Sequence, residues 1–133
     1  MKKSFACFIL LTVLIAFGCR KKNDEGGVVT GDASLDAQVM HHSNYVPGVR
    51  VFIRYNCPTF PIDGRDTTKY QSVLTTDASG YVHFDKLPNG THCLYATGFD
   101  PSVGAMVWGY NFIVIDNRPG EIRNYELTVP VSE

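Results

Sequence analysis

The sequence predicts an all-β domain in which two antiparallel sheets pack face to face as a sandwich. Helical periodicity is absent after residue 32, and seven short runs of alternating polar and apolar residues follow one another instead. Glycine, proline, asparagine and aspartate separate these runs, as is typical of turns between short strands. The roughly 100 residues involved are enough for one domain with a single two-layer core.

The first two strands are expected at residues 34–39 and 49–55, before and after a Pro47-Gly48 turn. In the second run, valine, isoleucine and tyrosine occupy the odd positions, whereas Arg50 and Arg54 lie on the other face. Successive side chains of a strand point to opposite sides of the sheet, so this alternation indicates one buried face.

Five further strands follow at similar spacing. Turns at Asp77-Ala78-Ser79-Gly80 and at Pro88-Asn89-Gly90 separate the third, fourth and fifth strands. We expect these five strands at residues 70–76, 81–84, 91–98, 107–115 and 122–131.

The chain begins with a segment typical of exported proteins. Lys2 and Lys3 precede a run of apolar and small residues that ends at Gly18, as in the leader of a secreted protein. The run falls short of the about 20 apolar residues that a membrane-spanning helix needs. We therefore expect residues 1–18 to be a signal peptide.

The quartet Ala16-Phe17-Gly18-Cys19 resembles a bacterial lipobox, in which the cysteine becomes diacylated and then N-terminal. Phe17 is bulkier than the usual small residue, and the alternative is an ordinary signal peptide that leaves an incidental cysteine. Lipidation of Cys19 implies a membrane anchor, because each buried CH₂ group contributes about 0.8 kcal/mol.

Residues 19–31 contain Cys19 and a polar, glycine-containing stretch without periodicity, which we interpret as a tether to the domain at residues 32–133. Asn23-Asp24-Glu25 resembles the acidic signal that directs some Gram-negative lipoproteins to the cell surface. We therefore expect a lipid-anchored protein of the outer membrane that faces the cell surface, with the periplasmic face as the alternative.

The charge balance argues against nucleic acid as a partner. The chain has 12 basic and 13 acidic residues, and the leader removes Lys2 and Lys3 but no acidic residue. The remaining 10 basic and 13 acidic residues give a net charge of −3, which does not attract phosphate backbones.

Two stretches, "PGVRVFIRY" and "TTDASGYVHFDKLPNGTHCLYATGFD", contain a Pro/Gly turn, a β-branched strand, Thr-Asp-x-x-Gly, Leu-Pro-x-Gly and a strand that ends in Gly-aromatic. This order resembles the transthyretin-like, carboxypeptidase-regulatory-type sandwich over about residues 34–130. The resemblance implies seven antiparallel strands in a Greek-key, prealbumin-like sandwich. It implies no particular activity, because this fold hosts unrelated functions. His92 stands where the family usually has an aromatic residue.

Cys57 and Cys93 remain once the leader and the lipidated cysteine are set aside, and an exported pair of this kind suggests one disulfide. The resemblance places them close together, because the family's second and fifth strands are antiparallel neighbours. Against the pairing, Cys93 shares a face with Tyr95 and not with the core-facing Leu94. Two buried free thiols are the alternative.

No set of catalytic residues is evident, and we expect neither an enzyme nor a cofactor. The residues that the resemblance would require of hydroxyisourate hydrolases, intradiol dioxygenases or isopeptide-forming domains are missing. We also expect no metal site, since the adjacent His41 and His42 would face opposite ways on a strand, and His83 and His92 have no spaced acidic partner.

The stretch "NCPTFPIDGRDTTK", residues 56–69, is the longest departure from the strand pattern, and long loops on rigid sandwiches often carry function. Phe60 and Tyr70 could contact a glycan or a protein, or Phe60 and Ile62 could plug an open end of the sandwich, which we favour. Asp66-Thr67-Thr68 resembles a short O-glycosylation signal and makes Thr67 a candidate for modification.

Trp108 and Tyr110 share one face of the sixth expected strand, where we expect core positions, with an aromatic platform as the alternative. Taken together, these features indicate a non-catalytic envelope lipoprotein that acts as a binding or structural accessory module. We expect protein contacts through an edge strand or the 56–70 loop. The alternative is a carbohydrate-contacting module that uses Phe60, Tyr70 or Trp108.

Overall fold

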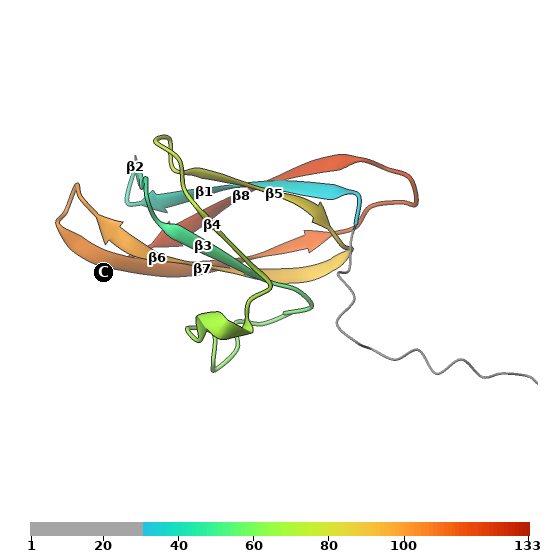
Figure 1. Cartoon of the computed structure of the whole chain (residues 1–133), viewed down its shortest axis with the longest axis horizontal. Helices are drawn as coiled ribbons and strands as arrows, with labels where there is room; N and C mark the ends of the chain where they lie inside the picture. The colour runs from blue at the N-terminus through green and yellow to red at the C-terminus, as the bar shows by residue number, and fades with distance from the viewer. Residues whose placement is uncertain (1–30) are drawn as a thin grey trace, which may run out of the picture.

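A computed structural model describes residues 31–133, and the leader, Cys19 and most of the tether lie outside the described residues. The described chain forms two β-sheets that pack face to face (Figure 1). The prediction of an all-β, two-sheet domain is therefore confirmed. Within residues 31–133, the only helical segment is a 3₁₀ turn, η1 (Thr67–Lys69), and no helix has the length and apolar character to cross a membrane.

The first sheet is built around β1 (Ala33–His41), which pairs along one edge with β8 (Arg123–Val131). The other edge of β1 pairs with β5 (Tyr81–Leu87) and then, at its end, with the two-residue β2 (Asn44–Tyr45). We call this sheet A.

The second sheet, sheet B, has the order β4 (Ser72–Thr75), β3 (Arg50–Arg54), β6 (Gly90–Asp100) and β7 (Ala105–Ile115). All three of its strand pairs are antiparallel. The strands β6 and β7 form a long hairpin that extends to one end of the molecule (Figure 1).

The hydrophobic core lies between the two sheets and is made by alternate residues of their strands. Each of its central side chains is withdrawn from solvent almost completely, and both sheets contribute to it. The central residues are Leu35, Ala37 and Val39 of β1, Val51 and Ile53 of β3, Leu94 and Ala96 of β6, and Val107 of β7.

The strand pairing differs from the prediction in one respect. The prediction of a fully antiparallel sandwich is wrong at β1 and β8, which run parallel over their whole length, from Ala33↔Arg123 to His41↔Val131. Alternation reveals which residues face the core but not the direction of a neighbour that lies far away in the chain. The expected third strand also begins later, at Ser72, because the backbone N–H of Tyr70 bonds within the η1 turn to Thr67 O.

Beyond its last residue, β8 joins the edge of sheet B. The backbone of Ser132 exchanges two hydrogen bonds with Trp108 of β7, at N···O distances of 2.8 and 2.9 Å. A Cβ atom at the neighbouring Gly109 would overlap the carbonyl of Pro130. Glycine is therefore required where the chain crosses from one sheet to the other.

Candidate functional site

A row of aromatic side chains crosses the outer face of sheet B, the face that points away from the core. Phe52 of β3 is paired with Tyr95 of β6, which is paired with Tyr110 of β7. The neighbours of Phe52 and Tyr95 along their strands belong to the core, so these two rings point outward, and Tyr110, which is paired with Tyr95, points the same way. Phe52 and Tyr95 are nevertheless only 5% and 6% exposed, and so a second layer must cover them.

The covering layer is residues 56–71, which we call the cover loop. Its Phe60 stacks on Tyr110, with ring centroids 4.1 Å apart and planes inclined by 17°. Its Tyr70 packs edge-on against Phe52 at 5.8 Å and lies 6.2 Å from Tyr95. The cover loop thus forms a small second core on the outer side of the sandwich.

Covalent and polar contacts hold the cover loop on the sheet. The structure joins Cys57 to Cys93 of β6 by a disulfide, with a Cα–Cα distance of 5.4 Å. Both cysteines lie on the outer side, so the face that Cys93 shares with Tyr95 favours the pairing. At the other end, Gln71 N donates to Ile53 O at 3.0 Å, and Arg54 bonds Asp63 at 3.1 Å.

The expectation that Phe60 and Ile62 plug an open end of the sandwich is wrong. Phe60 lies flat over the outer face of sheet B, and Ile62 is fully exposed. Gly64 makes this arrangement possible, because a Cβ atom there would overlap the ring of Phe60. The end-plug interpretation failed because it assumed one core, whereas this molecule has two.

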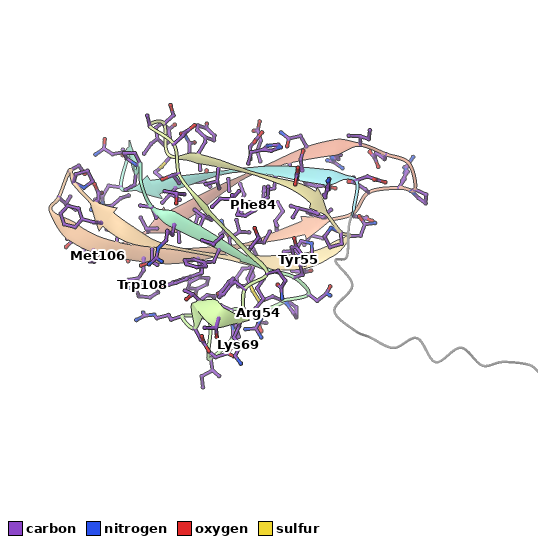
Figure 2. The ribbon with its side chains drawn as sticks, viewed as in Figure 1. Arg54, Tyr55, Lys69, Phe84, Met106 and Trp108 are labelled. Atoms are coloured by element: carbon purple, nitrogen blue, oxygen red, sulfur yellow. A yellow bond between two sulfur atoms is a disulfide. The ribbon has the colours of Figure 1, made fainter. Side chains whose placement is uncertain are left out.

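Four residues beside and beyond the cover loop stay partly or largely exposed on the outer face, and we call them the exposed strip. Phe99 and Met106 are paired across the β6–β7 hairpin, and Trp108 and Tyr110 follow along β7. Phe99 is 54%, Met106 61% and Tyr110 42% exposed. Figure 2 shows Met106 and Trp108 on this hairpin, away from the labelled Tyr55. A contiguous apolar surface of this kind marks an interaction site more often than isolated exposed residues do.

The assignment of Trp108 and Tyr110 to the core is also wrong, because it too assumed that the sandwich has one core. Val107 and Gly109 are the buried residues of this part of β7, and the two rings point to the other side. The guanidinium carbon of Arg65 lies 3.6 Å from the centre of the Trp108 ring, so the cover loop contributes a cation to the edge of the strip.

A hollow of about 420 Å³ adjoins the strip where β8 crosses β7. One wall is aromatic and the other is the end of the last strand. It is lined by Trp108, Gly109, Tyr110, Pro130, Val131 and Ser132.

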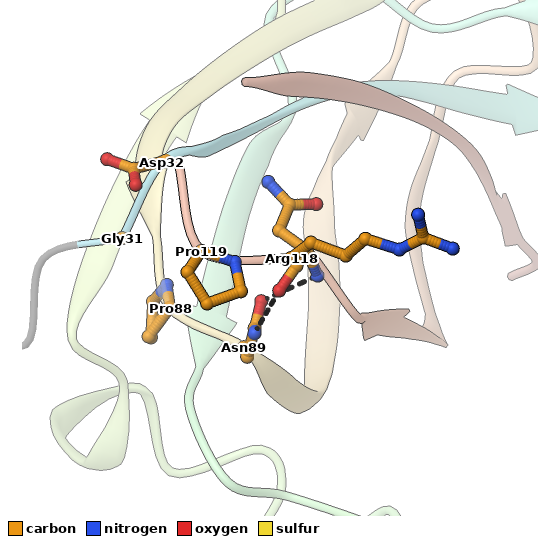
Figure 3. A pocket seen from close by; sticks show the side chains of 7 residues that line it. Gly31, Asp32, Pro88, Asn89, Arg118 and Pro119 are labelled. Carbon is orange, nitrogen blue, oxygen red and sulfur yellow. Dashed lines mark hydrogen bonds between the residues drawn. The ribbon is translucent and has the colours of Figure 1, made fainter. Parts of the chain in front are cut away.

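A second hollow, of about 270 Å³, lies at the opposite end of the sandwich, beside the point where residue 31 enters the domain (Figure 3). Asn89 Nδ2 donates to Asn117 O at 2.8 Å, and Asn117 N donates to Asn89 Oδ1 at 2.9 Å. These bonds tie the β5–β6 turn to the segment after β7, which indicates a structural role.

The structure separates the candidate contact residues into two groups. Phe60 and Tyr70 hold the cover loop in place, whereas Trp108 belongs to the exposed strip. The Tyr70 hydroxyl is partly buried and donates a hydrogen bond to Gly64 O. Desolvation by this burial raises the pKa of Tyr70 to about 12. Thr67 is exposed on η1, beside the Asp66 carboxylate that caps the turn.

His41 and His42 do not face opposite ways, and that part of the argument against a metal site is wrong. His42 follows the last residue of β1 and has a positive φ of 54°, which breaks the strand alternation. Their rings are stacked with centroids 4.4 Å apart.

Sequence reasoning missed Phe52, Tyr95, Phe99 and Met106. Phe52 lies between Arg50 and Arg54, so the pattern predicts a polar face there, and Tyr95 lies in a run that is buried on both sides. A strand with apolar residues on both faces is the one signal that could have indicated a second layer.

No protein-family model and no curated protein sequence matches the chain. Several solved structures share its fold, among them these two. One is the major pilin subunit of Bacillus cereus, with a TM-score of 0.50 and 11% identity over 77% of this chain. This chain spans only 30% of the length of that subunit. The other is a Pseudomonas aeruginosa protein described as a candidate carbohydrate-binding protein, with a TM-score of 0.53 and 14% identity over 79% of this chain and 92% of that one. At these identities the likeness establishes the small all-β fold alone.

Proposed function

We propose that this protein is a non-catalytic accessory module of the bacterial envelope that binds a protein partner through the exposed strip. The observation that carries the proposal is the set of exposed aromatic and methionine side chains that lie together on β6 and β7 beside the cover loop. Aromatic residues, methionine and arginine are the types enriched in the centres of protein interfaces. The strip and the adjoining Arg65 supply all three.

The position of the strip relative to the tether supports the same function. Residue 31 adjoins the start of β1, whereas the strip lies at the other end of the sandwich, near the end of β8 (Figure 1). The stretch of β7 between Trp108 and Ile115 separates the two ends by roughly 20 Å. A protein anchored through Cys19 at the outer membrane would therefore present the strip on the side away from the bilayer. We also propose that the sandwich has the transthyretin-like topology that its turns indicate. The major pilin subunit of Bacillus cereus contains a region of similar fold, and a role in protein contacts at the cell surface is compatible with that likeness.

Cross-linking in intact cells tests this function. A photoactivatable residue replaces Met106, and the cross-linked products of the lipidated protein are identified by mass spectrometry. We expect one dominant partner, which Trp108→Ala removes. Val114 is the matched control, because it is exposed on the outer face of the same strand but lies outside the strip. The proposal fails if Val114 yields the same products as Met106.

The anchor is tested separately. Cys19→Ala should release the protein from membranes, since the lipid chains are then absent. A variant that still sediments with salt-washed membranes would contradict lipidation at this residue.

Carbohydrate binding is the second candidate function, and the hollow beside Trp108 and Tyr110 favours it. Aromatic rings beside a polar backbone suit the stacking of a sugar ring. The Pseudomonas aeruginosa protein of similar fold is described as a candidate carbohydrate-binding protein. Binding to a glycan array that is lost in Trp108→Ala but kept in Val114→Ser would identify this function.

O-glycosylation of Thr67 stays a prediction, supported by the exposure of η1. Mass spectrometry of the Thr67 peptide from the native host tests it, and an unmodified peptide would exclude it.

A further inference from the structure

Four side chains of three elements meet at the end of the sandwich where β1, β6 and β8 all finish. His41 is the last residue of β1, Asp100 is the last residue of β6, and Glu133 follows the end of β8. His42 completes the group from the turn after β1. The parallel pairing of β1 with β8 places these chain segments side by side, although they are far apart in sequence.

The orientation of His41 is fixed by a buried carboxylate. Its Nδ1 lies 2.8 Å from Asp100 Oδ2, and the two side chains are 2% and 3% exposed. Asp100 is held in turn by Ser102, whose N and Oγ donate to Asp100 Oδ1 at 2.8 and 2.7 Å. With Nδ1 bound to the carboxylate, the remaining nitrogen, Nε2, faces Glu133 Oε1 at 4.0 Å.

His42 lies on the same side. Because its backbone adopts the left-handed region, its ring stacks on His41 and does not point to the opposite face. One nitrogen from each histidine and one carboxylate oxygen of Glu133 lie within 4.8 Å of one another.

We propose that His41, His42 and Glu133 form a binding site for a divalent transition metal of the zinc class. Two imidazoles and one carboxylate are a ligand set that zinc accepts, with a fourth position open to water. A ligating histidine usually donates its other ring N–H to a carboxylate, and Asp100 is placed to accept it as a positioning residue. Ligand atoms around a tetrahedral zinc lie roughly 3.3 Å apart, so His42 and Glu133 must each move by about 1 Å. Both are exposed and can do so.

A metal-free arrangement gives a different result. In that arrangement the two ring nitrogens of His41 contact only Asp100, at 2.8 Å, and Glu133, at 4.0 Å, and the cluster binds no zinc. Metal binding separates the two arrangements.

The test uses the full chain, extracted from membranes in detergent and purified without a histidine tag. Equilibrium dialysis against zinc chloride, followed by elemental analysis, should find one zinc per chain. His42→Ala and Glu133→Gln should each weaken binding by about tenfold or more. Both residues are exposed, so neither variant should alter the fold.

His83→Ala is the matched control, because His83 is an exposed histidine that bonds a single carboxylate, Asp36, at 2.6 Å. It should leave zinc binding unchanged. Asp100→Asn should weaken binding by about ten- to a hundredfold and alter the visible spectrum of the cobalt-loaded protein. A purely structural role for Asp100 would leave that spectrum unaltered. Failure to bind zinc, or equal affinity in the wild type and the His42→Ala variant, would overturn the proposal.

Discussion

The two faces of sheet B both bury apolar groups, but by different means. On the inner face, Leu94 and Ala96 are covered by a complete second sheet that pairs and packs independently of any one loop. On the outer face, Phe52 and Tyr95 are covered by a single segment, the cover loop, which depends on a disulfide and a few polar contacts. We therefore expect side chains of similarly low exposure on the two faces to differ in how much of the structure must open to expose them.

The extent to which the cover loop covers the outer face of sheet B also changes along the strands. Near the disulfide this face is sealed by Phe60 and Tyr70, whereas near the β6–β7 turn Phe99 and Met106 are left open. The cover loop thus sets the boundary between a structural part and a part that is free for binding.

The largest effect is expected at the inner face. Leu94→Ala leaves a cavity between the sheets and should lower the free energy of unfolding by about 2–5 kcal/mol. Urea unfolding followed by circular dichroism measures this change. A loss below that of Gly64→Ala would contradict the ranking of the two faces.

Removal of the disulfide should have the next largest effect. The double variant Cys57→Ser/Cys93→Ser should lower the free energy of unfolding by about 2–4 kcal/mol, because the bond constrains the unfolded chain. The 36-residue separation of the cysteines is long enough for that constraint to matter. Hydrogen exchange should show opening of the cover loop while β1 stays protected. Reduction should raise the intact mass by the mass of two protons per chain. An unchanged mass would show that the bond is absent.

Gly64→Ala should act on the cover loop alone. The new methyl group would overlap the Phe60 ring and should cost about 1–3 kcal/mol by forcing that ring off Tyr110. Tyrosine and tryptophan fluorescence reports the change. Ile62→Ala, two residues away and fully exposed, is the control and should be neutral.

Alkaline pH should also loosen the cover loop. Burial raises the pKa of Tyr70 from 10.0 in the unfolded chain to about 12 in the folded one. The folded state therefore holds the phenol proton of Tyr70 more tightly than the unfolded chain does. The contribution of protonated Tyr70 to stability is complete below pH 10 and is lost as the pH rises toward 12. Burial also raises the pKa of Tyr55, so ultraviolet titration of tyrosinate should resolve more than one late-titrating group, and Tyr70→Phe should remove one of them.

The smallest effect on stability is expected at the exposed strip. Met106→Ser should change the free energy of unfolding by less than about 0.5 kcal/mol, because the side chain is already exposed. The same variant should lose the partner. A stability loss comparable to that of Gly64→Ala would mean that the strip is structural.

Sequence reasoning identified every strand of more than two residues, because alternation and turn residues are local signals. It did not identify the parallel partner of β1, the second layer over Phe52 or the common side of His41 and His42. Each of these depends on something that the local pattern lacks: a neighbour far away in the chain, a loop folded back on the sheet, or a positive φ at the end of a strand. Alternation places Trp108 and Tyr110 on one face of their strand but does not tell which face is buried, and in the structure the buried positions are Val107 and Gly109.

The pairing of β1 with β8 has a consequence for the order in which the chain acquires its structure. Ser34 donates a hydrogen bond to Asn124, 90 residues further along. One edge of the central strand of sheet A therefore stays open until the last strand has been synthesised and released. Contacts of such long range slow folding, so sheet A stays incomplete for as long as β8 has not emerged from the ribosome.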